Sequence, residues 1–191
     1  MSVRLGLPLV AILALLLAAP PARSAEPLPQ LLPTRDVDIT YDVTRPDQPP
    51  IRERRRWLAE GHLRRVDGPD KSSTIFDPTK NEVTLLNPKT RSFRKLDGVP
   101  RRPADPQKGA VLTRGGETVI AGLHCVDWSW TEDTDTHTVC VTEDGVLLRL
   151  IINGRTILQA RSVTYGKQPV ELFQIPHGYS PALAPEGSHG D

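Results

Sequence analysis

The two cysteines of the chain, Cys125 and Cys140, constrain its fold more than any other feature of the sequence. Each lies in a run rich in β-branched and aromatic residues, and the polar stretch TEDTDT separates the two runs. A hairpin that sets Cys125 directly opposite Cys140 brings both sulfurs to one face, within the reach of a disulfide. This register pairs Trp128 with His137 and places the turn at residues 132–133. The sequence therefore predicts an antiparallel hairpin closed by a disulfide.

The first 24 residues have the layout of a secretory signal peptide. A positively charged start is followed by an apolar run from Leu5 to Ala19, and small residues precede a cleavage point after Ser24. The apolar run is short for a membrane span, which needs about 20 residues, and no lipid-acceptor cysteine follows it. We therefore expect a periplasmic or secreted protein that does not span a membrane after cleavage. In that oxidising compartment two cysteines favour a disulfide over a redox or metal pair.

Short β-type runs separated by turn residues fill most of the remaining chain. In residues 36–43, Val, Ile and Tyr alternate with Asp and Thr, the pattern of a strand with one buried face. Residues 51–59 carry charge on both faces, which predicts an edge strand or a rim. The stretch 71–96 predicts a meander of three strands with Asx-Pro turns, and tight Asp-Gly and Asn-Gly turns follow at 144–145 and 153–154. The sequence therefore predicts a mainly β fold of adjacent antiparallel strands.

Composition divides the chain into four parts. These are a signal peptide (1–24), a proline-rich N-terminal segment (25–35), a single antiparallel β domain (36–180) and a disordered tail (181–191). Within the domain, residues 171–179 are expected to add one more extended piece. Residues 99–116 lack periodicity, and they either cover an opening of the sheet or form a disordered crossover between its two halves.

The order of these pieces resembles small exported bacterial proteins of the lipoprotein-carrier (LolA/LolB-like) superfamily, in particular its uncharacterised branch. The resemblance covers roughly residues 36–180 and is carried by TIFD, EVTLL, FRKL, IAGLHC, VCVTEDGVLLRL, VTY and LFQIPHGY. It implies an antiparallel meander curled into a half-open barrel around an apolar cavity, with one or two short helices available as a lid. The carriers begin with an amphipathic helix, whereas EPLPQLLPT in this chain is too rich in proline for one.

The resemblance also implies a function. Members of that superfamily bind acyl chains or the hydrophobic parts of lipoproteins, and no catalysis is attributed to the fold. We therefore expect a non-catalytic binding protein for a lipid-like or other apolar ligand. The cysteine hairpin and the residues just before it supply the candidate ligand-binding residues, which are Ile120, Val126, Trp128, Trp130 and Val139.

An uneven distribution of charge supports an alternative function. Residues 52–114 contain 16 Lys and Arg against 8 Asp and Glu, whereas residues 115–191 contain 4 against 10. Such a basic half could dock an acidic envelope protein, an anionic polymer or acidic lipid headgroups, with Arg54, Arg55 and Arg56 as candidate contacts. The simpler interpretation is a solvated outer face whose charges protect the strands from aggregation.

The sequence lacks the motifs of common enzymes and cofactor sites. It has no GxSxG, HExxH, CxxC or glycine-rich phosphate loop. His124 and His137 are predicted to share a face, but no third ligand accompanies them, so we expect neither a metal nor another cofactor. Nucleic-acid binding is disfavoured because the chain carries a net charge of only +1, has few aromatic residues and is exported. We therefore expect that the protein is not an enzyme.

Overall fold

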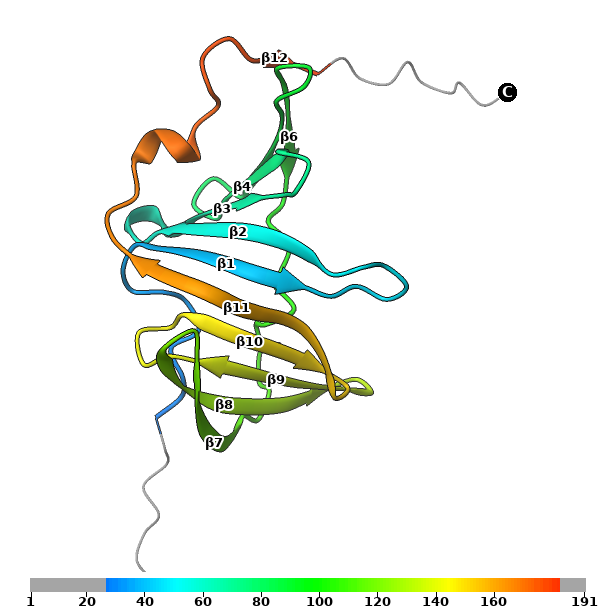
Figure 1. The fold of residues 1–191 in the computed structure, drawn as a ribbon, viewed down its shortest axis with the longest axis vertical. Helices are drawn as coiled ribbons and strands as arrows, with labels where there is room; N and C mark the ends of the chain where they lie inside the picture. Colours follow the sequence, from blue (N-terminus) through cyan, green and yellow to red (C-terminus); the bar gives the residue numbers. More distant parts are fainter. Residues whose placement is uncertain (1–26, 183–191) are drawn as a thin grey trace, which may run out of the picture.

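The computed structural model describes residues 27–182. The predicted signal peptide and residues 183–191 of the predicted tail lie outside the described residues. Twelve strands form one sheet (Figure 1), and two short 3-10 turns accompany them. The strands are β1 (Val37–Val43), β2 (Ile51–Leu58), β3 (Leu63–Asp67), β4 (Ser73–Asp77), β5 (Glu82–Asn87), β6 (Ser92–Asp97), β7 (Thr113–Ile120), β8 (Leu123–Glu132), β9 (Asp135–Val141), β10 (Leu147–Ile152), β11 (Arg155–Tyr165) and β12 (Ser180–Pro181); the turns are η1 (Glu60–His62) and η2 (Val170–Phe173).

The sheet consists of two meanders joined by one long-range pairing. Strands β1 to β6 lie side by side in sequence order, and so do β7 to β11. The two meanders meet where β1 pairs with β11, antiparallel, with Val37 opposite Tyr165 and Val43 opposite Leu158. The sheet does not close, because β7 forms one edge and β12, parallel to β6, forms the other. The predicted mainly β, half-open antiparallel architecture is confirmed.

One face of the sheet, which we call the inner face, curls around most of the core. Alternation places Val37, Ile39 and Tyr41 of β1 on this face, and all three are buried. They belong to a single cluster that also contains Trp57 of β2 and Trp130 of β8. Side chains from strands far apart in the sheet can share one cluster only because the sheet is curved.

Strand β2 was predicted at an edge or rim, and that prediction is wrong. It lies in the interior of the sheet between β1 and β3. Its arginines are accommodated there because neighbouring strands supply carboxylates. On the outer face Arg54 and Arg56 pair with Asp38 of β1, and Arg56 also pairs with Asp67 of β3. A run of arginines can therefore occupy a central strand when acidic residues lie directly beside it.

The cysteine hairpin forms with a register that differs by two residues from the predicted one. Asp127, instead of Cys125, lies opposite Cys140, and Trp130, instead of Trp128, lies opposite His137. The disulfide therefore joins diagonal neighbours, whose Cα atoms are 5.4 Å apart. A shift of two leaves every side chain on its predicted face. The turn is centred on residues 133–134, where Asp133 adopts a φ of 53°.

A second turn interrupts the β-type run that contains Cys125 and was expected to form one strand of the hairpin. Ala121 and Gly122 have φ values of 51° and 80°, and Ile120 pairs with Leu123 across them. Positive φ at both central residues is the geometry of a tight type I′ hairpin. The run is thus two strands, β7 and β8, and β7 begins at Thr113, inside the stretch 99–116 that was expected to be irregular.

The segment from Gly98 to Leu112, called here the crossing segment, connects the two meanders. It runs across one face of the sheet from β6 to β7 (Figure 1). Ala104 in its middle is only 5% exposed and belongs to the main core cluster. Of the two alternatives left open by the sequence, the structure therefore shows the covering segment.

The C-terminal part of the domain covers the outer face near β4 and β5. Phe173 of η2 packs in a second cluster with Leu58, Ile75 and Leu86. The extended piece predicted at 171–179 is not a strand: residues 170–173 form the turn η2, and the pairing comes later, in β12. Within residues 27–182, no helix has both the length and the apolar character needed to cross a membrane.

Candidate functional site

The inner face and the crossing segment enclose an apolar cavity of about 140 Å³. Its floor is built by alternating residues of β1 and by residues from β10 and β11, and Pro103 and Ala104 of the crossing segment form its roof. An apolar cavity of roughly 150 Å³ is large enough to hold benzene. The floor residues are Ile39, Tyr41, Val43, Leu147, Leu150, Ile157 and Leu158.

Polar contacts at both ends hold the roof in place. Arg102 pairs with Asp105 within the crossing segment, and its Nη2 donates a 2.8 Å hydrogen bond to the carbonyl oxygen of Leu31. His137 Nδ1 lies 3.1 Å from the carbonyl oxygen of Pro103, and the His137 ring stacks on Trp130. The crossing segment is thus attached to the N-terminal segment on one side and to β9 on the other.

A second cavity, of about 170 Å³, lies next to the first. Trp57, Arg64 and Arg102 line both cavities and form the partition between them. The other side chains that line the second cavity are mostly apolar, such as Phe76, with a few polar ones, such as His62. Together the two cavities form a hollow under the crossing segment that is divided mainly by two arginines and a tryptophan.

Four arginines line this hollow. Arg56 is held by Asp38 and Asp67, and the other three differ in their partners. Arg55 bonds the buried carboxylate of Glu53 at 2.8 Å, and Arg102 pairs with Asp105. Arg64 instead lies over the ring of Phe76, with its guanidinium carbon 3.9 Å from the ring centre. No ion pair or hydrogen bond to the Arg64 side chain is found among residues 27–182.

The hollow perturbs the acid–base properties of its walls. Burial and, to a smaller extent, the nearby charges of Arg102 and Arg55 lower the pKa of Arg64 to about 10, although the charge of Asp105 opposes this shift. Burial raises the pKa of Tyr41 to about 12, and its hydroxyl donates a 2.6 Å hydrogen bond to the carbonyl oxygen of Leu147. At neutral pH Arg64 is therefore charged and Tyr41 neutral, in surroundings that disfavour charge.

The predicted ligand-binding residues lie apart from this hollow. Val126 and Trp128 share the inner face but line a different depression of about 280 Å³, beneath the N-terminal segment. Trp130 and Val139 are packed in the core, at 3% and 0% exposure. Ile120 lies on the opposite face from Val126, because it pairs with Leu123 whereas Val126 pairs with Glu117. Ligand contact by these five residues stays a prediction.

Sequence reasoning missed the residues that do line the hollow. The alternation in residues 36–43 marked Ile39, Tyr41 and Val43 as buried, but it contained nothing to show that a cavity lay above them. Arg64 carried no local signal, because its burial depends on Trp57 opposite it in β2 and on the crossing segment above.

The three candidate docking arginines do not form one surface. Arg54 and Arg56 point to the outer face, whereas Arg55 points to the inner face, where its guanidinium lies over Tyr41. Arg56 is only 11% exposed and is held by two carboxylates, whereas Arg54 is 53% exposed. Their role in docking a partner remains a prediction. Only Arg54 and Arg56 share a face, the outer one, and could contact a partner together.

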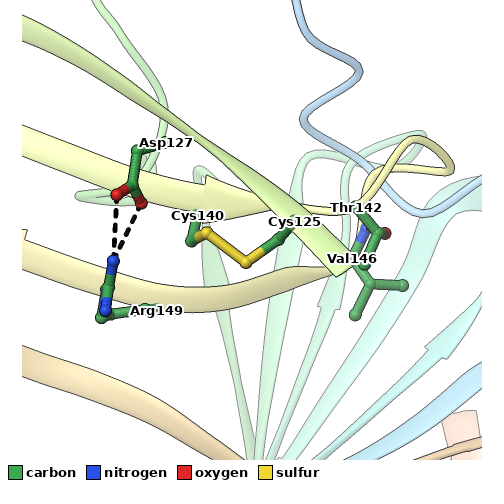
Figure 2. Close-up of a disulfide and its surroundings, with 6 residues drawn as sticks. All are labelled: Cys125, Asp127, Cys140, Thr142, Val146 and Arg149. Carbon is green, nitrogen blue, oxygen red and sulfur yellow. Dashed lines mark hydrogen bonds and ion pairs between the residues drawn. A yellow bond between two sulfur atoms is a disulfide. The ribbon is translucent and has the colours of Figure 1, made fainter. Parts of the chain in front are cut away.

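The disulfide lies on the outer face of the hairpin. Figure 2 shows the Cys125–Cys140 bridge beside an ion pair between Arg149 and Asp127, in which both oxygens lie 3.0 Å from Nη2. Both cysteines are almost fully buried. The bridge therefore braces β8 and β9 behind the inner face and takes no part in the hollow. Within residues 27–182, His, Cys, Asp and Glu form no group of three or more that could hold a metal ion.

Comparisons with known proteins identify the fold. No protein-family model and no curated protein matches the sequence. Among solved structures, an uncharacterized conserved protein from Thermus thermophilus matches with a TM-score of 0.54 and 13% identity, over 78% of this chain and 90% of that one. A chain of the Pseudomonas aeruginosa MucA/MucB complex matches with a TM-score of 0.53 and 15% identity, over 73% of this chain and 55% of that one.

Two further matches complete this picture. A crystal structure of MucB matches with a TM-score of 0.51 and 14% identity, and the aligned region covers 75% of this chain and 58% of MucB. The chain thus spans little more than half the length of MucB. A LolA superfamily protein from Nitrosomonas europaea matches with a TM-score of 0.37 and 11% identity, over 76% of this chain and 92% of that one. The chain shares its fold with MucB and with the Thermus protein.

Proposed function

We propose that the protein is a non-catalytic, exported binding module that holds an apolar group between its inner face and the crossing segment. The observation that carries this proposal is the apolar cavity roofed by Pro103 and Ala104. A concave, mostly apolar space with a few polar groups on its walls is the usual form of a small-molecule site, so this cavity on the inner face of a curved sheet favours a ligand. Export is supported by the signal-type N-terminus.

Movement of the crossing segment is part of the proposal. The cavity of about 140 Å³ accommodates only a small apolar group while the roof is in place. A longer acyl chain requires the crossing segment to lift from the sheet. Its attachment mainly by arginine contacts and one carbonyl contact to His137, with few buried apolar side chains, makes such a movement inexpensive compared with opening the strands.

The proposal predicts that filling the cavity weakens ligand binding. Ala104→Phe places a ring in the space under the roof, so we expect the affinity of the mature chain for an environment-sensitive acyl probe to fall about tenfold or more, which corresponds to about 1.4 kcal/mol. The measurement is a fluorescence titration, with the melting temperature recorded to show that the variant folds.

Val119→Phe is the matched control, because Val119 is 54% exposed on the edge strand β7. This variant should bind the probe as the unmodified chain does. Equal affinity of the Ala104→Phe variant and the unmodified chain would show that the probe does not occupy the cavity and would overturn the proposal.

A second candidate function is an interaction module for a protein partner in the cell envelope. It is favoured by the MucA/MucB complex, in which a protein of this fold assembles with another protein. Its predicted contacts are the basic residues Arg54, Arg55 and Arg56, and an acidic protein or anionic polymer would suit them. A mature chain that neither binds the acyl probe nor copurifies with lipid would favour this candidate over the first.

A further inference from the structure

Arg64 is placed where proteins rarely leave an unpaired charge. Its side chain lies in the partition between the two cavities, over the ring of Phe76 and beside Trp57. Within residues 27–182 it has neither an ion pair nor a hydrogen bond. Arg64 is half-buried, and a cation partly removed from water is normally paired with a carboxylate or another acceptor.

The other charges around the hollow do not compensate Arg64. Arg55 is engaged by Glu53, which also receives a bond from Arg45, and Arg102 is engaged by Asp105. The charged Arg, Lys, Asp and Glu residues that line the two cavities are Arg55, Arg56, Arg64, Arg102 and Asp105, so cations outnumber anions on the walls of the hollow. The charge of Asp105 acts on Arg64, but Asp105 is already paired with Arg102, so an anion entering the hollow would find the Arg64 guanidinium without an ion-pair partner among residues 27–182.

A second group in the same partition also lacks a partner among the described residues. The indole Nε1 of Trp57 is buried and donates no hydrogen bond there. Buried indole N–H groups normally find an acceptor. Trp57 lies directly opposite Arg64 in the β2–β3 pairing. Trp57 and Arg64 thus line the same apolar space, and neither the indole Nε1 of Trp57, which is itself buried, nor the guanidinium of Arg64 has an acceptor among residues 27–182.

We infer that the ligand of this hollow is an amphiphile with a single carboxylate head, which binds Arg64, and an acyl tail, which lies along Ile39, Leu150 and Leu158. This inference deepens the function proposed above and rests on it. A carboxylate can accept two parallel bonds from a guanidinium, and its small head fits a divided hollow. The tail replaces solvent in the apolar cavity.

The inference is tested by comparing octanoate with octanol, which share the acyl chain and differ in the charged head. Isothermal titration of the unmodified mature chain should show octanoate binding about tenfold or more tightly than octanol. Arg64→Met should remove this preference while octanol still binds, because Met keeps the length and apolar character of the wall. Arg64→Lys should keep part of the preference, since it retains the charge but not the two-pronged geometry.

Arg52→Met is the matched control, since Arg52 is an exposed arginine of the same strand pair on the outer face. It should leave the preference for octanoate intact. If Arg64→Met does not fold, the ratio in the unmodified chain and in Arg64→Lys decides the matter. Acetate, which lacks the tail, should bind weakly; acetate binding as tightly as octanoate would overturn the role of the tail.

The outcomes separate this inference from the function on which it rests. Octanol binding as tightly as octanoate to the unmodified chain would overturn the carboxylate head and leave the apolar binding function standing. Failure of both octanol and octanoate to bind would overturn both. If Arg64→Met still prefers octanoate, the carboxylate does not bind at Arg64, and the assignment of Arg64 as the head-group site is overturned.

Discussion

Single residues in the inner face combine apolar surroundings with carefully placed polar groups. Tyr41 is only 3% exposed, and its one hydroxyl bond goes to the carbonyl oxygen of Leu147 in β10. That bond joins the β1 and β10 strands, which are not neighbours in the sheet, across the intervening β11. The hydroxyl therefore ties the two meanders together from inside the core.

Tyr41 predicts a loss of stability at alkaline pH. Its pKa is about 12 in the folded chain, because burial disfavours the phenolate, and close to 10 when unfolded. The unfolded state therefore releases the proton first, and the free energy of unfolding falls as pH rises from about 10 to 12, by at most roughly 3 kcal/mol from this group. Urea unfolding at several pH values measures the slope.

Tyr41→Phe should flatten that slope and should also cost about 1 kcal/mol at neutral pH, since the Leu147 carbonyl loses its donor. Tyr179→Phe, in the outer cluster, serves as the control and should keep the slope. An unchanged slope in Tyr41→Phe would assign the alkaline loss to other groups.

At the scale of elements, the N-terminal segment is held against the β9–β10 turn. The backbone N–H of Thr34 donates to the carbonyl oxygen of Asp144, and the Asp144 carboxylate bonds Arg35, Thr142 and Tyr165. Gly145, the next residue, lies so close to the segment that an added Cβ would be 2.1 Å from the carbonyl oxygen of Leu32. The segment that precedes β1 therefore packs directly against this turn.

Gly145 and Gly154 have similar backbone conformations. Substituting each of them therefore separates the cost of this close contact from the cost of a positive φ. Gly145 and Gly154 have φ values of 87° and 75°, but an added Cβ at Gly154 would meet nothing within 4 Å. We expect Gly154→Ala to cost about 1 kcal/mol from its positive φ alone. Gly145→Ala should cost at least about 1 kcal/mol more and should expose residues 30–34 to protease.

Chemical denaturation measures both costs, and limited proteolysis reports on the segment. Equal destabilisation by the two substitutions, with no new cleavage near residues 30–34, would show that the segment does not pack against Gly145 in solution.

At the scale of the whole molecule, the crossing segment connects the two meanders across the inner face, over the β1–β11 pairing. It starts at the end of β6, passes over the hollow and enters β7 at the far edge of the sheet. Arg101 pairs with Glu132 of β8, and Arg102 reaches the N-terminal segment. The segment is thus both a connection and the roof of the hollow.

This arrangement predicts that loosening the roof leaves the sheet intact. Arg102→Met removes the bonds to Asp105 and Leu31, so amide hydrogen exchange within residues 102–110 should accelerate about tenfold, as expected for roughly 1.4 kcal/mol of lost local stability. Exchange in β1, β10 and β11 should not change. Arg114→Met, which removes only an exposed pair with Glu117, is the control. Uniform acceleration over all strands would contradict a separately opening roof.

Short-range patterns in the sequence were sufficient to predict most of the architecture. Alternation in β1, the Asx-Pro turns of the β4–β6 meander and the Asp-Gly and Asn-Gly turns predicted an antiparallel sheet correctly, because turn type and side-chain alternation depend on neighbouring residues. The only two cysteines predicted the bridge. The hairpin register was missed by two residues because that slip leaves every side chain on the same face, so the apolar pattern cannot detect it.

The candidate site was beyond such local reasoning. The sequence alone determined most of the strands and tight turns, the faces that are apolar and the pairing of the cysteines. Only the tertiary structure decided that β1 meets β11, that β2 is central, and that Arg64 lies in a hollow under the crossing segment. Strand identity follows from short-range sterics and turn chemistry, whereas a cavity and the partners of a charge depend on residues that lie far apart in the chain and meet only on folding.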